Sequence, residues 1–138
     1  MNEKIFSILI MMVCAVILVN AQLKKDPFIP PEKVILGMVK ASTENDARTY
    51  LSCFGGELKN LLQEQRNNLG EELFRQRFMT NYQNLMGVVL SNEEKISENL
   101  TRVMVEFVFQ DTNQFKSYLF ERRGNDWKIK KIIDMSNG

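Results

Sequence analysis

The pattern of apolar positions changes once along this chain, and the change separates a helical half from a strand half. Between Pro31 and about Leu85, apolar residues recur every three or four positions, which is the spacing of helices with one buried face. These positions are Val34, Ile35, Met38 and Ala41; Ala47, Tyr50, Leu51 and Phe54; Leu58, Leu61, Leu62 and Leu69; and Leu73, Phe74, Phe78 and Tyr82. The first half is therefore predicted to be a run of short amphipathic helices.

From Gly87 onward the apolar period becomes two, which is typical of half-buried strands. The clearest strand spans 101–109, and its odd-numbered positions form the face that must be buried. A strand over 87–96 precedes it, a return strand over 115–122 follows it, and a last strand begins at Trp127. Helices followed by a meander of strands predict an α+β domain, with the helices packed against one side of a curved antiparallel sheet of about four strands.

The pairing of the two middle strands decides which side chains enter the core. If Gln110 lies opposite Gln114, Ser117 and Glu121 fall on the buried face. The second face then carries four apolar residues, Met104, Val108, Tyr118 and Phe120. Because such a face is usually covered, these residues are predicted to form a homodimer surface.

The last hairpin leaves two registers open. A two-residue turn at Gly124-Asn125 pairs Phe120 with Ile129, whereas a three-residue turn pairs Glu121 with Ile129. We expect a bulge to reconcile the two faces of this strand. Its lysines, Lys128, Lys130 and Lys131, are predicted to protect the sheet edge from pairing with other sheets, with an anionic ligand or membrane headgroup as the alternative.

The first 21 residues have the order of a secretory signal peptide. Lys4 and the terminal amine precede an apolar run, 5–19, and Val19-Asn20-Ala21 resembles a cleavage site. We expect cleavage after Ala21 and a periplasmic or extracytoplasmic location, with an uncleaved membrane anchor or lipidation at Cys14 as alternatives. Residues 22–30 then form a polar tether, and 31–138 form one domain.

Composition narrows the chemistry. The net charge is +1, from 18 Lys and Arg against 17 Asp and Glu, so the chain lacks the basic surface that nucleic acids require. It has no histidine, which excludes serine-histidine and cysteine-histidine catalysis and removes the commonest transition-metal ligand. No metal site or cofactor is expected. After cleavage Cys53 is the single remaining cysteine, so no internal disulfide is possible. We expect it to fill core space, with an intermolecular disulfide or a reactive thiol as the alternatives.

One constellation suggests a pocket. Ser117 and Glu121, together with Tyr50 and Tyr82 from the helices, would bring polar groups into an apolar interior, and we treat these four as ligand-binding candidates. A buried Glu121 would have a raised pKa and could act as an acid or base without histidine. The alternative is that Glu121 lies at the end of the sheet and reaches water.

Three segments together resemble a known superfamily. The opening helix PEKVILGMVKA, the short helix ENDARTYLSCF and the ending FERRGNDWKIKKI are similar to nuclear transport factor 2-like proteins, also called the cystatin-like α+β cone, over about residues 31–134. The ending also resembles exported bacterial members of unknown function. The resemblance implies a cone whose interior holds a small apolar ligand or an active site. Enzymes of this superfamily, ketosteroid isomerases and SnoaL-like polyketide cyclases, use Asp, His or Tyr, and this chain matches neither motif.

We therefore hypothesise an exported, non-enzymatic binding or interaction domain that holds a small apolar ligand in its cone. A carboxylate and tyrosine enzyme of the isomerase or dehydratase kind, using Glu121 with Tyr82, is the second hypothesis. The third is a helper subunit bound to an envelope protein, which predicts an exposed apolar patch.

Overall fold

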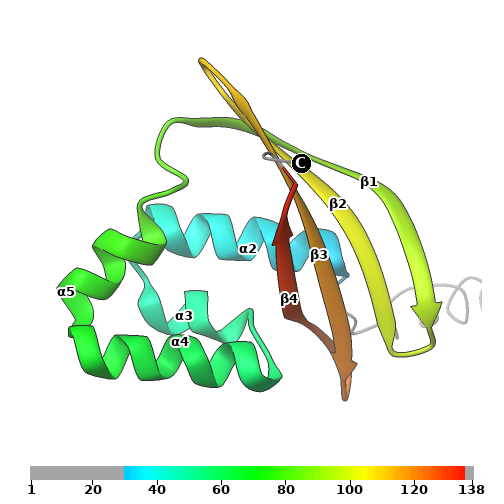
Figure 1. The fold of residues 1–138 in the computed structure, drawn as a ribbon, viewed down its shortest axis with the longest axis horizontal. Helices are drawn as coiled ribbons and strands as arrows, with labels where there is room; N and C mark the ends of the chain where they lie inside the picture. The colour runs from blue at the N-terminus through cyan, green and yellow to red at the C-terminus, as the bar shows by residue number, and fades with distance from the viewer. Residues whose placement is uncertain (1–29, 136–138) are drawn as a thin grey trace, which may run out of the picture.

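The structure is a computed structural model, and it describes residues 30–135. Helices come first and strands follow, as Figure 1 shows. The elements are α2 (Pro31–Thr43), α3 (Ala47–Ser52), α4 (Gly56–Leu69), α5 (Glu71–Phe74), the π-helical turn η1 (Arg75–Met79), β1 (Leu85–Ser97), β2 (Leu100–Phe109), β3 (Asn113–Arg123) and β4 (Asp126–Asp134). The predicted α+β order is confirmed. The predicted signal peptide and tether, up to residue 29, lie outside the described residues.

The strands form one antiparallel sheet in the order β1-β2-β3-β4. Figure 1 shows the sheet curving, with the helices gathered on one side of it. We call the side that faces the helices the concave face and the opposite side the convex face. The predicted sheet of about four strands with helices on one face is therefore confirmed.

Local chemistry explains where the helices start and stop. Pro31 occupies the first position of α2, where a missing backbone N–H costs nothing. The Asp46 side chain caps α3 by accepting a hydrogen bond from the Thr49 N–H at 3.1 Å. Helical structure ends at Met79, so Tyr82 lies in the turn that leads to β1 rather than on a continued helix.

The buried face of β2 agrees with its sequence pattern. Val103, Val105 and Phe107 are all buried on the concave face against the helices. They join apolar residues from every helical segment in one core, in which the largest fully buried side chains are Tyr118, Phe54, Phe74, Phe107, Phe120, Ile35 and Met38. A hydrocarbon interior between helices and sheet is therefore present, as predicted.

The predicted register between β2 and β3 is wrong. The hairpin closes where the Phe109 N–H donates to the Thr112 carbonyl at 2.9 Å, and Asn113 pairs with Val108. Relative to the prediction, this register moves β3 by three residues and exchanges its two faces.

The observed register places Tyr118 and Phe120 on the concave face and Ser117 and Glu121 on the convex face. This register is favoured over the predicted one for two physical reasons. Two aromatic rings leave water, while a carboxylate avoids burial among apolar side chains.

The last hairpin follows the two-residue alternative. Arg123 pairs with Asp126 across the turn, and Phe120 pairs with Ile129. The expected bulge is present, because Phe120 pairs with Ile129 while Leu119 pairs with Lys131. Lys130 is thus the extra residue, and the exposed Lys130 and Lys131 follow each other on the convex side.

A short backbone segment lies along the free edge of β4. The Gly55 N–H donates to the Ile129 carbonyl at 3.0 Å, and the Ile129 N–H donates to the Cys53 carbonyl at 2.9 Å. This forms a parallel bridge between Phe54 and Ile129. Glycine is required at position 55, because a Cβ atom there would lie 2.9 Å from the Lys128 Cβ.

Candidate binding site on the concave face

All three tyrosines of the chain converge in the core from different elements. Tyr50 comes from α3, Tyr82 from the turn before β1, and Tyr118 from β3. Tyr50 and Tyr82 are each 6% exposed, and Tyr118 is fully buried. Helical period explains the burial of Tyr50, and strand alternation explains that of Tyr118.

Aromatic contacts hold these rings in place. The Phe107 ring is 5.2 Å from that of Tyr82 and 6.2 Å from that of Tyr118, measured between centroids. Tyr50 contacts Phe54 at 5.1 Å and the Phe74 edge at 6.3 Å. These separations are typical of favourable aromatic pairs. The rings thus form a largely apolar wall, to which the tyrosine hydroxyls add polar groups.

The Tyr118 hydroxyl has no hydrogen-bond partner among the described residues, although it is completely buried. The neighbouring Tyr82 hydroxyl interacts with it closely enough to shift the pKa of both groups, but the pair does not meet the geometry of a full hydrogen bond. Burial raises the pKa of Tyr118 well above its usual value, and it also raises the pKa of Tyr82 and of Tyr50. All three hydroxyls are therefore neutral donors and acceptors at physiological pH.

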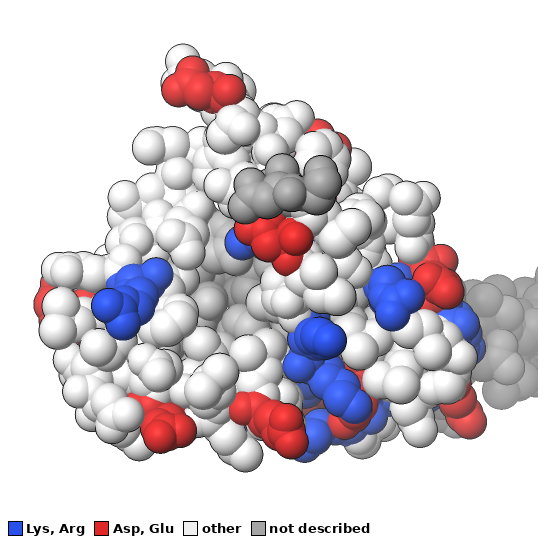
Figure 2. Space-filling view, in the orientation of Figure 1, with Lys and Arg blue, Asp and Glu red and all other residues white. Residues whose placement is uncertain are grey.

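Two residues of opposite charge, Lys116 and Asp134, lie next to the tyrosines. Lys116 lies two residues before Tyr118 on the same face, and its ammonium nitrogen is 5.8 Å from the centroid of the Phe107 ring. Asp134 is opposite Lys116 in the β3–β4 register and acts on the pKa of Tyr118. Figure 2 shows the surface hollowed in the middle of this view, with a basic and an acidic side chain at its rim.

Two of the four predicted ligand-binding residues enter this interior, and two do not. Tyr50 and Tyr82 are in the core, and their ligand role stays a prediction. Ser117 and Glu121 are on the convex face, contrary to expectation. Sequence reasoning missed Tyr118 and Lys116 because the three-residue register error assigned both to the wrong face.

Glu121 is the carboxylate on which the enzyme hypothesis rested. It accepts hydrogen bonds from Lys130 at 2.9 Å and from Arg123 at 3.1 Å. The hydrogen bond from Lys130 is the main reason that its pKa lies below the usual value, rather than above it. Glu121 therefore does not converge with Tyr82 and is not a raised-pKa acid or base in the interior.

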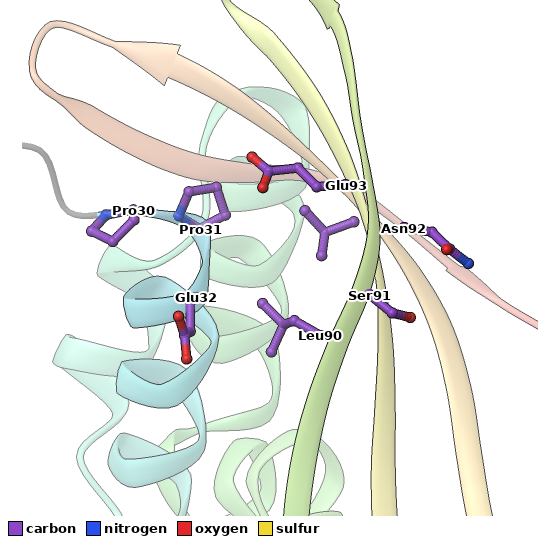
Figure 3. A pocket seen from close by; sticks show the side chains of 8 residues that line it. Pro30, Pro31, Glu32, Leu90, Ser91, Asn92 and Glu93 are labelled. Atoms are coloured by element: carbon purple, nitrogen blue, oxygen red, sulfur yellow. The ribbon is translucent and has the colours of Figure 1, made fainter.

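A second hollow lies where the start of α2 approaches β1. Its volume is about 370 Å³, and it is lined by Pro30, Pro31, Glu32, Leu90, Ser91, Asn92, Glu93 and Val103. Figure 3 shows Leu90 and Glu93 directed toward the helix, whereas Ser91 and Asn92 point away from it. Residues 30–135 contain no grouping of acidic and cysteine side chains that could hold a metal ion.

Cys53 is buried and its thiol lies 3.5 Å from the Thr49 carbonyl oxygen. Burial raises its thiol pKa, which keeps it protonated and unreactive. This environment favours its predicted use as core filler.

The predicted dimer surface is partly misplaced. Met104 and Val108 are half-buried on the convex face, as expected, but Tyr118 and Phe120 are in the core. The register brings other apolar residues beside Met104 and Val108. These are Val89, Phe115 and Ile133, each more than 40% exposed. We call these five residues the convex patch.

Comparison with known proteins gives likeness of fold only. No protein-family model matches the chain, and no curated protein matches it in sequence. The crystal structure of an NTF-2-like protein of unknown function from Shewanella oneidensis MR-1 has a TM-score of 0.48 and 12% identity, covering 74% of this chain and 93% of that one. The solution structure of a SEC-C motif containing protein from Rhodopseudomonas palustris has a TM-score of 0.51 and 10% identity, covering 75% and 77% respectively.

The α+β fold predicted from the sequence, with helices on one side of a curved four-stranded antiparallel sheet, is confirmed by the arrangement of these elements (Figure 1). Membership of the NTF-2-like superfamily stays a prediction. In the part of the chain that is described, no helix is both long and apolar enough to span a membrane.

Proposed function

We propose that this protein is an exported, non-enzymatic binding domain that holds a small apolar ligand against the concave face of its sheet. The observation that carries the proposal is the buried Tyr118 hydroxyl, which has no partner among residues 30–135. An unsatisfied buried hydroxyl lowers the stability of the folded state by about 1–3 kcal/mol. Buried polar groups without a partner are uncommon, so this one calls for an explanation, and ligand binding is one. A ligand with one polar atom would supply the missing hydrogen bond.

The surroundings of Tyr118 define the ligand class. Aromatic rings of Phe107, Tyr82 and Tyr50 favour a flat or compact hydrocarbon body. A neutral tyrosine can donate to a carbonyl, ether or hydroxyl oxygen. Lys116 at the border would favour an uncharged or anionic polar end over a cationic one.

Catalysis receives no support from this arrangement. Glu121 and Tyr82, the pair required by an isomerase or dehydratase, lie on opposite sides of the sheet. The interior has neutral tyrosines instead of a group poised to transfer a proton near neutral pH. Binding without chemistry is the function that these groups favour.

The decisive experiment is native mass spectrometry of the full chain purified from its own host. We expect a small molecule that is retained by the wild type and lost from Tyr118→Phe, while Tyr50→Phe retains more of it. The same spectrum reports whether cleavage occurs after Ala21. An adduct equally retained by Tyr118→Phe, or a wild type that never carries one, would contradict the proposal.

The convex patch supports a second proposal, that two copies associate through this face. Phe115 and Ile133 are exposed on neighbouring strands, and Met104 lies between β1 and β3 on the same face. Exposed apolar residues gathered on one face mark association surfaces. Here they lie around Glu106, which pairs with both Val89 and Phe115. An envelope protein is the alternative occupant, and it predicts that the purified chain is monomeric.

A further inference from the structure

A groove on the outside of the domain combines leucines with lysines. It lies between α4 and the strands β3 and β4, and its volume is about 550 Å³. It is lined by Glu57, Leu58, Leu61, Leu119, Lys130 and Lys131. Leu58 packs against the core from one side, while Leu61 on the same helix is 53% exposed. A volume of this order suits a small organic ligand, for which pockets of about 300–1,000 Å³ are usual.

The groove is separate from the concave-face site. Leu119 and Tyr118 are consecutive residues of β3, so their side chains project to opposite faces of the sheet. Tyr118 faces the core, and Leu119 contributes to the groove. A ligand in the groove would therefore not contact the tyrosines.

The bulge in β4 gives the groove its charge. Lys130 and Lys131 both reach this side because Lys130 is the extra residue between two β3 partners. The ammonium of Lys130 is already paired with Glu121 at 2.9 Å. Lys131 forms no ion pair with any residue in 30–135. Bulges often redirect side chains beside functional sites, and here the bulge presents a lysine that has no ion-pair partner among residues 30–135.

Charge is distributed unevenly over the lining. Glu57 belongs to the first turn of α4 and would repel an anion, whereas the lysines come from β4. Figure 2 shows Lys and Arg side chains gathered over the lower part of β4 and the β3–β4 turn. An anionic group would therefore bind at the lysine side, with its apolar part across the leucines.

From these features we propose that the groove binds a single-chain anionic amphiphile, a hydrocarbon chain that ends in a carboxylate or phosphate. Its head group pairs with Lys131, and its chain covers Leu58, Leu61 and Leu119. The charge-assisted contact supplies specificity, and burial of the exposed Leu61 supplies affinity.

The test uses the full chain and sodium decanoate below its micelle concentration, with binding measured by calorimetry and by amide chemical-shift changes. We expect saturable binding with shifts at Leu61, Leu119 and Lys131. Lys131→Glu should weaken it by roughly tenfold or more, as loss of a charge-assisted contact implies. Leu61→Asp should do the same without unfolding the protein, because Leu61 is already exposed.

Matched controls separate this site from other surfaces. Lys95→Glu and Leu36→Asp alter an exposed lysine and an exposed leucine elsewhere, and both should leave decanoate binding unchanged. Tyr118→Phe should also leave it unchanged, which keeps this test independent of the concave-face proposal. Decanol and decylamine, which lack the negative charge, should bind at least about tenfold more weakly.

Three outcomes would overturn the proposal. Decanoate affinity could be unaffected by both Lys131→Glu and Leu61→Asp, or it could be lost in Tyr118→Phe. An acidic amphipathic peptide, such as a helix of alternating Glu and Leu stretches, could bind the groove while decanoate does not, which would assign it to a protein partner instead.

Discussion

Val103 of β2 lies directly opposite Tyr118 of β3, and both side chains are buried on the concave face. This single pairing determines the character of both faces. It brings the tyrosine hydroxyl into the core and places Ser117 and Glu121 on the convex face, where Ser117 stays buried and Glu121 is half-buried. A slip of one residue would reverse the assignment, because side chains alternate along a strand.

Replacing Tyr118 by phenylalanine should stabilise the ligand-free protein. The change removes a buried hydroxyl without a partner and retains the ring contact with Phe107. We expect the free energy of unfolding to rise by about 1–3 kcal/mol in urea titrations. Tyr50→Phe is the matched control and should change it less, since the Tyr50 hydroxyl is not among the buried unpaired atoms. A loss of stability in Tyr118→Phe would show that the hydroxyl is satisfied in the native state, by bound water or by Tyr82.

Alkaline pH should unfold the protein cooperatively. Burial raises the pKa of Tyr50, Tyr82 and Tyr118 above the value of about 10 that they have when unfolded. Above about pH 10 the unfolded chain releases tyrosine protons that the native state keeps. The contribution of these tyrosines to the free energy of unfolding is therefore fully present below about pH 10 and is lost as the pH rises. Between its pKa in the unfolded chain and its pKa in the native state, each such tyrosine lowers the free energy of unfolding by about 1.4 kcal/mol per pH unit.

Absorbance of tyrosinate at ultraviolet wavelengths, followed together with circular dichroism, checks this expectation. The two signals should change at the same pH, because tyrosinate forms only on unfolding. If tyrosinate appeared while the protein stayed folded, at least one tyrosine would be exposed to solvent in the native state.

The convex patch should hold two copies of the chain together. Phe115→Glu combined with Ile133→Glu adds two negative charges to the patch beside Glu106, and we expect sedimentation velocity to change from dimer to monomer. Ile96→Glu is the control, because Ile96 is exposed near the end of β1, away from these residues. A wild type that sediments as a monomer would favour an envelope protein as the occupant of this face.

Two glycines should respond to alanine in opposite directions. Gly37 is inside α2, and a Cβ atom there would meet nothing within 4 Å, so Gly37→Ala should stabilise the protein by roughly 0.5–1 kcal/mol. Gly55→Ala would bring its Cβ to 2.9 Å from the Lys128 Cβ and should destabilise it by about 1–3 kcal/mol. Thermal melts of the two variants check both signs. Equal melting temperatures would mean that the Phe54–Ile129 bridge is loose.

The helices and β2 were predictable because their apolar residues follow one period without competition. Met38 and Phe54 have polar neighbours on the solvent side, and Val105 alternates with Met104 and Glu106. The core of the sheet followed from the same rule. Here burial of one face outweighs any other local preference.

The register of β3 was not predictable from the sequence. The predicted site therefore included Ser117 and Glu121 and omitted Tyr118 and Lys116. Both faces of β3 carry large apolar residues, with Phe115 and Leu119 on one and Tyr118 and Phe120 on the other. The turn between Phe109 and Asn113 admits more than one loop length, so alternation alone cannot choose. The aromatic pair is buried because it removes more apolar area from water and leaves Glu121 hydrated.

The short backbone segment beside Ile129 limits how this sheet could polymerise. Pairing of strands from chain to chain into an open fibre requires two free edges on every subunit. The Phe54–Ile129 bridge already occupies the middle of the β4 edge, which leaves β1 as the edge open to a neighbour within residues 30–135. Pairing through β1 alone would join two subunits β1 to β1 and could not extend further.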